Sequence, residues 1–163
     1  MRKKIVAGNW KMNNNRTETK NLIKSLKELK FSSHVRVMIA PAFIHLAEAE
    51  EMTSGSIIEV IAQNMNAAES GAFTGEISAG MLQSIGVKKV ILGHSERRTF
   101  YNESDESLKD KVSTALQNDM EFIFCFGEQL SDRKSNSHFD VIKAQLSNAL
   151  FHLSSSSWSN IIL

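Results

Sequence analysis

The sequence contains a single proline and a single cysteine among its 163 residues. One cysteine cannot form an internal disulfide, and Cys125 lies in an apolar run, so the chain is expected in a reducing compartment such as the cytoplasm. Hydrophobic residues make up 42% and charged residues 23% of the chain, which excludes disordered and collagen-like classes. We therefore expect one globular domain over residues 1–163.

The chain also has almost no net charge. Nineteen Lys and Arg against 18 Asp and Glu leave +1, so no overall field attracts nucleic acid or an acidic membrane. The basic start Met1-Arg2-Lys3-Lys4 is followed by a short apolar stretch, Ile5–Gly8, which is too short for a secretory leader. No apolar run approaches the roughly 18 residues that a membrane span needs. We expect neither a nucleic-acid partner nor membrane insertion.

Short and nearly continuously apolar runs recur along the chain at wide spacing. Such runs are typical of parallel strands covered on both faces, and the spacing leaves room for a crossover helix between successive strands. Each run therefore predicts a buried strand in an α/β fold. The runs are residues 5–7, 35–40, 57–62, 90–92, 122–126 and one that starts at Ile161.

Apolar stripes at helical spacing lie between these runs. The Lys-rich face of the first stripe is interpreted as solvated scaffold, and the second stripe follows Ser104. Ser135, Asn136 or Ser137 is available to cap the third. The tetrad Ser154–Ser157 predicts a loop. The stripes comprise Leu22, Ile23, Leu26 and Leu29; Leu108, Val112, Ala115 and Leu116; and Phe139, Ile142, Leu146, Ala149, Leu150 and Leu153.

Polar residues follow the predicted strands where each one ends. They are Asn9 and Lys11, Gln63 and Asn64, His94, and Glu128. The carboxyl ends of parallel strands meet at one rim, where ligands bind in such folds. The first strand lacks the Gly-x-Gly-x-x-Gly pattern of a dinucleotide-binding sheet, so a (β/α) barrel is favoured.

Among these rim residues, His94 and Lys11 are the strongest candidates for chemistry. His94 precedes a helix start at Ser95, where backbone N–H groups favour a neutral imidazole that donates a hydrogen bond to an oxyanion. Lys11 supplies a positive charge for a phosphate or an enediolate. The alternatives are an ordinary rim histidine and a solvated lysine. A serine nucleophile is disfavoured because Arg97 replaces the last glycine of that motif, and the histidine spacing predicts no metal site.

The segment from Gln63 to Ser78 has neither helical nor strand periodicity. A loop of this length in a compact domain is usually functional or an interaction arm, although a plain insertion is the alternative. Phe73 lies between Gly71 and Gly75, and we expect it to occupy a pocket, one that another chain can supply.

Three segments together resemble one family. Residues 7–13 (AGNWKMN), 71–76 (GAFTGE) and 91–98 (ILGHSERR) are similar in order and spacing to triosephosphate isomerase. The resemblance covers the whole chain, more weakly from Asp132 to Ser159. It implies a TIM (β/α)8 barrel that interconverts dihydroxyacetone phosphate and D-glyceraldehyde 3-phosphate through an enediolate, in glycolysis and gluconeogenesis, with no metal and no organic cofactor.

The resemblance also implies roles for individual residues. Asn9 and Lys11 bind the phosphorylated triose, and Lys11 counters its charge. His94 is the neutral electrophile that polarises the carbonyl, a role already described for this enzyme. Glu96 braces the catalytic site, and Ser95 holds the turn after the fourth strand.

A homodimer of the full-length protein is a further implication. The long loop inserts near Asn9–Met12 of a twin subunit, where Thr74 reaches the active site and Glu76 pairs with Arg97. Cys125 is a buried structural thiol near the site. The predicted dimer-loop residues are Phe73, Thr74, Gly75, Glu76 and Arg97.

The chain departs from the family in length. Complete barrels have eight strands and about 250 residues, whereas this sequence reaches only the start of a sixth strand at Ile161. The family's glutamate base, mobile lid and two further phosphate-binding turns are missing, and neither Glu103 nor Glu128 matches the base. A positioned acid or base typically increases the reaction rate about 10²- to 10⁴-fold. Without the family's base, the 163-residue chain is expected to be essentially inactive. Open strand edges also predict poor folding.

Three hypotheses follow from the sequence. The first is an isomerase whose chain is truncated before its catalytic glutamate. The second is a non-catalytic short product that binds a full-length isomerase. The third is another (β/α)-barrel enzyme that acts on a phosphosugar.

Overall fold

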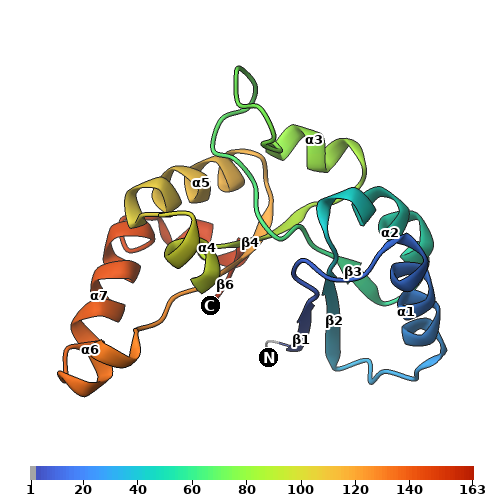
Figure 1. The fold of residues 1–163 in the computed structure, drawn as a ribbon, viewed down its shortest axis with the longest axis horizontal. Coiled ribbons are helices and arrows are strands. Elements are labelled where there is room, and N and C mark those ends of the chain that lie inside the picture. Colours follow the sequence, from blue (N-terminus) through green and yellow to red (C-terminus); the bar gives the residue numbers. More distant parts are fainter. Residues whose placement is uncertain (1–2) are drawn as a thin grey trace. The chain divides into compact units, whose positions relative to one another are not determined.

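The computed structural model describes residues 3–163, so the basic residues Met1 and Arg2 lie outside the described part. The chain forms two compact units. The first comprises the residues up to Gln63 together with Met81–Lys89, and the second comprises Asn64–Gly80 and Val90–Leu163. Figure 1 shows strands and helices alternating along the chain. Each unit is described by itself, and the expectation of one domain over residues 1–163 stays a prediction.

All of the predicted strands form. They build two three-stranded sheets, in the orders β1-β2-β3 and β4-β5-β6. The pairs β1/β2, β2/β3 and β5/β6 are parallel, as the apolar runs predict. The bounds are β1 Lys4–Asn9, β2 Val35–Ala40, β3 Ile58–Val60, β4 Lys89–Leu92, β5 Glu121–Phe124 and β6 Ile161–Ile162.

The first strand is less buried than the sequence predicts. Val6 is 61% exposed because β1 is the outer strand of its sheet and has β2 as its only strand neighbour there. The interpretation of residues 5–7 as a buried strand is therefore wrong in burial, although right in secondary structure. The central strand β2 behaves as expected, since its last four residues are all buried.

The first unit packs its helices against this sheet. They are α1 (Arg16–Glu28), the 3-10 turn η1 (Phe43–His45) and α2 (Leu46–Thr53), with α1 and α2 in contact (Figure 1). Helix α1 begins at Asn15, whose side chain accepts from the Glu18 N–H at 3.0 Å while Glu18 accepts from the Asn15 N–H at 2.8 Å. Of the predicted stripe only Ile23 is fully buried, whereas Leu22 and Leu29 are exposed.

The second unit contains most of the remaining helices. Helix α5 starts as predicted, with the Ser107 N–H donating to Ser104 Oγ at 3.1 Å. The predicted loop at Ser154–Ser157 is instead largely the 3-10 helix η2, a tight turn in which Ser154 Oγ bonds to two following serines. The bounds are α3 Ala79–Ser84 at the boundary between the units, α4 Ser95–Phe100, α5 Asp105–Gln117, α6 Leu130–Lys134, α7 His138–Ala149 and η2 Ser155–Asn160.

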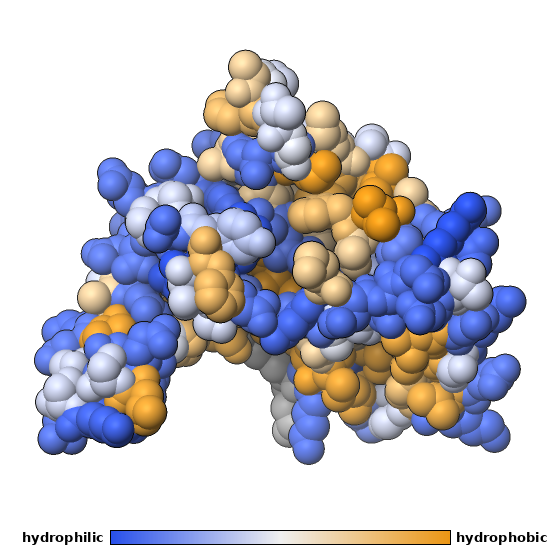
Figure 2. Space-filling view, viewed as in Figure 1, coloured by the Kyte–Doolittle hydropathy of each residue, from blue (hydrophilic) through white to orange (hydrophobic). Residues whose placement is uncertain are grey.

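The apolar stripe predicted for α7 is only partly buried. Ala149 and Leu150 at its C-terminal end have no exposed surface and α7 packs against α5, but Phe139 is 74% exposed. Figure 2 shows apolar surface at the end of the second unit formed by α6 and the start of α7. Ser137 occupies the predicted N-cap position but makes no side-chain capping bond.

Buried charges fix the start of the long loop to α5. Lys111 Nζ donates to Asn64 Oδ1 at 2.9 Å and forms an ion pair with Glu103, which also accepts from Arg97 Nε at 2.9 Å. Burial alone would raise the pKa of Glu103, but hydrogen bonds from Lys111 and Arg97 outweigh it and lower that pKa below 4.5. The network keeps the Glu103 carboxylate charged inside the second unit.

The long loop is closed at its base and exposed at its tip. The Asn66 N–H donates to Ile77 O at 2.8 Å, and Phe73 at the tip is 51% exposed. The expected pocket around Phe73 is thus absent within the described chain, and a pocket on another chain stays a prediction. Over residues 3–163, no helix combines the length and the apolar character needed to cross a membrane.

Candidate active site

The turn after β4 places His94 at the start of α4. Gly93 has φ +75°, a left-handed conformation that glycine adopts without strain, and it redirects the chain out of the sheet. A Cβ on Gly93 would lie 2.9 Å from Cys125 O, so the close approach of the β4 and β5 ends also requires glycine. His94 then takes the N-cap position of α4.

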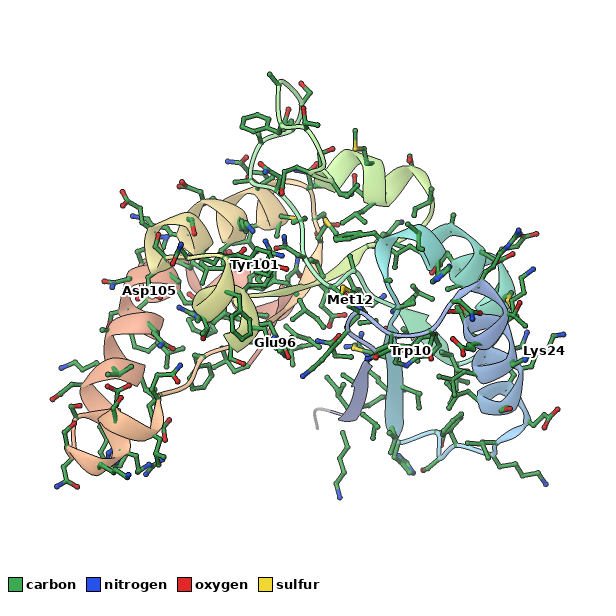
Figure 3. The ribbon with its side chains drawn as sticks, viewed as in Figure 1. Trp10, Met12, Lys24, Glu96, Tyr101 and Asp105 are labelled. Carbon is green, nitrogen blue, oxygen red and sulfur yellow. The ribbon has the colours of Figure 1, made fainter. Side chains whose placement is uncertain are left out.

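The His94 ring is oriented by Glu96. Nδ1 of His94 accepts from the Glu96 N–H at 3.3 Å and lies 3.5 Å from Glu96 Oε2. Because accepting from a backbone N–H requires a lone pair on Nδ1, this contact belongs to the neutral ring, in which Nε2 carries the hydrogen. The structure places a helix-start N–H group and the Glu96 carboxylate beside the imidazole, and the catalytic roles of His94 and Glu96 stay predictions. Figure 3 shows Glu96 on α4 and Asp105 at the start of α5.

A cavity of about 640 Å³, here called the His94 pocket, opens beside this ring. The ends of β4 and β5 and the segment that follows β5 form it, with Gly93, His94, Arg98, Cys125, Glu128 and Gln145 among its lining residues. This size accommodates a small ligand. Cys125 is half-buried rather than buried as expected, because it lines the pocket, and its structural role stays a prediction. Its partial burial raises the pKa of the thiol, so at neutral pH it stays protonated.

Arg98 joins the two strand ends below the pocket. Its guanidinium donates to Gly93 O at 3.0 Å and to Cys125 O at 3.2 Å, and it pairs with Asp105 at 2.6 Å. These bonds satisfy two carbonyls where the β4/β5 ladder ends. The backbone that carries His94 is therefore held at a fixed distance from the strand opposite.

Glu128 lines the pocket but has a structural partner. Its carboxylate accepts from Arg133 Nε at 2.9 Å. Hydrogen bonds from its own backbone N–H and from Arg133 lower the pKa of Glu128, so it is a poor proton acceptor at neutral pH. This geometry agrees with leaving Glu128 without a catalytic role in the sequence-based assignment.

The other predicted substrate-binding residues lie in the first unit. Lys11 has φ +54°, its N–H donates to Asn9 Oδ1 at 2.9 Å, and its carbonyl accepts from Gln63 Nε2 at 2.9 Å. Gln63 also donates to Ala40 O at 2.8 Å, which ties this turn to the end of β2. Trp10 and Met12 flank Lys11 after β1 (Figure 3). The structure thus groups Asn9 with Lys11 and His94 with Glu96, and their action on one ligand stays a prediction.

The predicted dimer-loop residues have partners within the second unit. Glu76 accepts from Asn66 Nδ2 at 2.9 Å, and Arg97 bonds to Glu103 and stacks 4.9 Å from the Tyr101 ring centroid. Thr74 and Gly75 form a tight turn closed by the Glu76 N–H donating to Phe73 O at 3.0 Å. The pairing of Glu76 with Arg97 was expected between subunits and stays a prediction.

Several functionally placed residues were not assigned a role from the sequence. The sequence places Gln63 at the rim, but its hydrogen bond to the Lys11 carbonyl is visible only in the structure. A sequence signal marks Lys111, because its spacing places this lysine on the same, apolar face of α5 as Leu108 and Ala115. A lysine on such a face indicates a buried charge that needs a partner. Gln145 carries no such signal, because its partner is the backbone of Gly127, which only the fold brings close. Arg98 bonds to two backbone carbonyls besides its ion pair with Asp105, and no side-chain pattern marks those carbonyls. No group of three metal-ligating side chains occurs among residues 3–163.

Comparison with known proteins decides the family. The sequence model of the triosephosphate isomerase family matches residues 4–163. The chain belongs to the triosephosphate isomerase family. The predicted α/β class and TIM-barrel family are thereby confirmed, with two three-stranded sheets observed where the complete barrel has eight strands.

Triosephosphate isomerases of known identity align along the entire chain. The protein from Flavobacterium psychrophilum is 55% identical over 164 residues, that from Flavobacterium johnsoniae 50% over 164, and that from Bacteroides fragilis 48% over 165. Each alignment covers 100% of this chain. The chain spans 66% of the length of both Flavobacterium isomerases and 65% of the Bacteroides isomerase.

Proposed function

We propose that this chain carries part of the active site of an isomerase that interconverts dihydroxyacetone phosphate and D-glyceraldehyde 3-phosphate. The observation that carries the proposal is the contact between Glu96 N–H and His94 Nδ1 at 3.3 Å. It leaves Nε2–H of a neutral ring as a donor at a cavity of about 640 Å³. Membership of the triosephosphate isomerase family supports the choice of substrate.

The proposed reaction moves a proton between adjacent carbons of the triose. Abstraction of a proton from the carbon beside the carbonyl gives an enediolate, and Nε2–H of His94 stabilises the oxygen on which charge develops. His94 then moves protons between the two oxygens. Lys11 counters the charge of the phosphate and of the enediolate, Asn9 contacts the substrate, and Glu96 keeps the ring oriented.

Neither Glu128 nor Glu103 is suited to act as the base for the first step. Glu128 is held as a carboxylate by Arg133, and Glu103 is buried between Lys111 and Arg97. A lowered pKa in both residues disfavours proton abstraction. We therefore propose that this chain binds the triose phosphate without turning it over.

The assembly and compartment proposed for the full-length protein follow from the family and from the loop. We propose a cytoplasmic homodimer in which the loop tip contacts the partner. Phe73 supports this, because half of its ring surface is exposed between two glycines with positive φ, Gly71 and Gly75.

Titration with dihydroxyacetone phosphate tests the proposed function. The His94 ring signals in NMR spectra of the 163-residue chain should shift saturably, while those of the exposed His152 should not. A coupled assay for glyceraldehyde 3-phosphate should show no more turnover than His94→Gln. An unmoved His94 signal contradicts the proposed binding of the triose phosphate at His94, whereas turnover that disappears in His94→Gln contradicts only the proposed lack of turnover.

A further inference from the structure

Gln145 clamps the backbone of one residue, Gly127, in the wall of the His94 pocket. Its Oε1 accepts from the Gly127 N–H at 2.9 Å, and its Nε2 donates to Gly127 O at 3.0 Å. The side-chain amide therefore satisfies both backbone groups of one residue, as a neighbouring strand would. Gln145 and Gly127 both line the pocket.

Gly127 belongs to the wall segment, residues 126–129, which follows β5 and ends at the start of α6. Its other side-chain bonds are local, since the Gln129 N–H donates to Asp132 Oδ2 at 2.9 Å and Glu128 pairs with Arg133. Both partners lie in α6, a helix of five residues. These local bonds shape the segment but do not anchor it to the rest of the second unit.

Helix α7 gives Gln145 a firm base. It comprises 12 residues, packs against α5 and ends in the fully buried Ala149 and Leu150. Gln145 lies 18 residues beyond Gly127, so its two bonds join the wall segment to a different, well-packed element. Glycine has more backbone conformational freedom than any other residue. Without the two bonds from Gln145, the backbone at Gly127 would therefore be freer to change conformation than at another residue.

We propose that Gln145 is a positioning residue that sets the affinity of the His94 pocket for a phosphorylated triose by holding the backbone N–H and carbonyl of Gly127. The inference rests on the proposed function. Releasing the clamp lets the wall segment sample other conformations, so the ligand must select the competent one at a cost in affinity. Gln145 needs no contact with the ligand for this effect.

Two substitutions separate the clamp from the bulk of the side chain. Gln145→Leu keeps a similar volume and loses both bonds, whereas Gln145→Glu keeps an acceptor for the Gly127 N–H and loses the donor to Gly127 O. Gln117→Leu is the matched control, because Gln117 is exposed at the C-terminal end of α5 and does not line the pocket.

The test is the Kd for dihydroxyacetone phosphate from the His94 signals, combined with hydrogen exchange of the Gly127 amide, at a temperature where all variants are folded. We expect the Kd to rise about tenfold in Gln145→Leu, which loses both hydrogen bonds, and about threefold in Gln145→Glu, which loses one. A single hydrogen bond thus contributes about threefold to the affinity. The Gly127 amide should exchange faster in Gln145→Leu, and Gln117→Leu should match the unmodified chain.

Three results overturn the inference in distinguishable ways. Faster Gly127 exchange with unchanged Kd in Gln145→Leu shows that the clamp is structural only, even if the variant melts at a lower temperature. Equal loss of affinity in Gln117→Leu shows a nonspecific effect. Absence of binding in the unmodified chain refutes the proposed function itself, and the inference with it.

Discussion

Lys111→Met is expected to destabilise the second unit by about 3–5 kcal/mol, the range measured when one partner of a buried ion pair is removed. Lys111 and Glu103 are each 8% exposed, and Glu103 Oε2 already lacks a hydrogen-bond partner within the described chain. Methionine fills much of the lysine volume but leaves the carboxylate with Arg97 as its remaining cation. It also removes the bond to Asn64 that fixes the start of the long loop.

Urea unfolding followed by circular dichroism measures this effect, with Lys109→Met on the exposed face of α5 as the matched control. The double variant Lys111→Met/Glu103→Leu should recover part of the loss, because it removes the unpaired charge as well.

The pKa of Glu103 is lowered in the folded chain, so the ion pair stabilises the chain fully above the ordinary pKa of 4.5. That contribution is lost as pH falls through the lowered value, so the difference between Lys111→Met and the unmodified chain should shrink in acid. A loss no larger than that of Lys109→Met would show that the pair contributes nothing.

Gly93→Ala is expected to lower the free energy of unfolding by about 2–4 kcal/mol, through a left-handed backbone and an overfilled site together. The new methyl group would lie 2.9 Å from Cys125 O and 3.1 Å from Leu108 Cδ1. Cys125 O is a backbone atom held by Arg98, so it cannot retreat without loss of that bond. The substitution should therefore also displace His94.

Gly55→Ala isolates the contribution of backbone strain. Gly55 has φ +71°, close to that of Gly93, but nothing lies within 4 Å of an added Cβ. It should cost only about 1–2 kcal/mol, the strain of the left-handed conformation alone. Thermal unfolding of both variants gives the comparison, and equal losses would refute the proposed steric contact between β4 and β5.

The regular elements could be predicted from the sequence because their signals are local. The runs at Val35–Ala40 and Val90–Leu92 carry the hydrophobic continuity of buried parallel strands, and both form. The helix predicted after Ser104 forms as α5, and its cap is a bond between Ser104 and a neighbour in the chain. Burial was less predictable, since Val6 and Phe139 have apolar side chains but lie on an outer strand and at an uncovered helix start.

The candidate site could be predicted only in part. His94 was found because a strand end and a helix start flank it in the sequence, and Glu96 lies two residues away. Gln145 acts on the backbone of Gly127, and Arg98 acts on two backbone carbonyls besides its ion pair with Asp105. Every residue has such backbone groups, so no side-chain pattern marks these partners. Sequence signals thus located the chemical groups, whereas the bonds that orient them depend on tertiary packing.

The central proposal, which the family resemblance implies, is that Lys11 and His94 act on the same triose phosphate. Its most direct test is a dihydroxyacetone phosphate titration of the chain carrying carbon-13 in its lysine and histidine side chains. The account predicts that the Lys11 and His94 signals move together and saturate at one ligand concentration, while Lys24 on α1 stays unmoved. A His94 response without any Lys11 response, or two different midpoints, would contradict it.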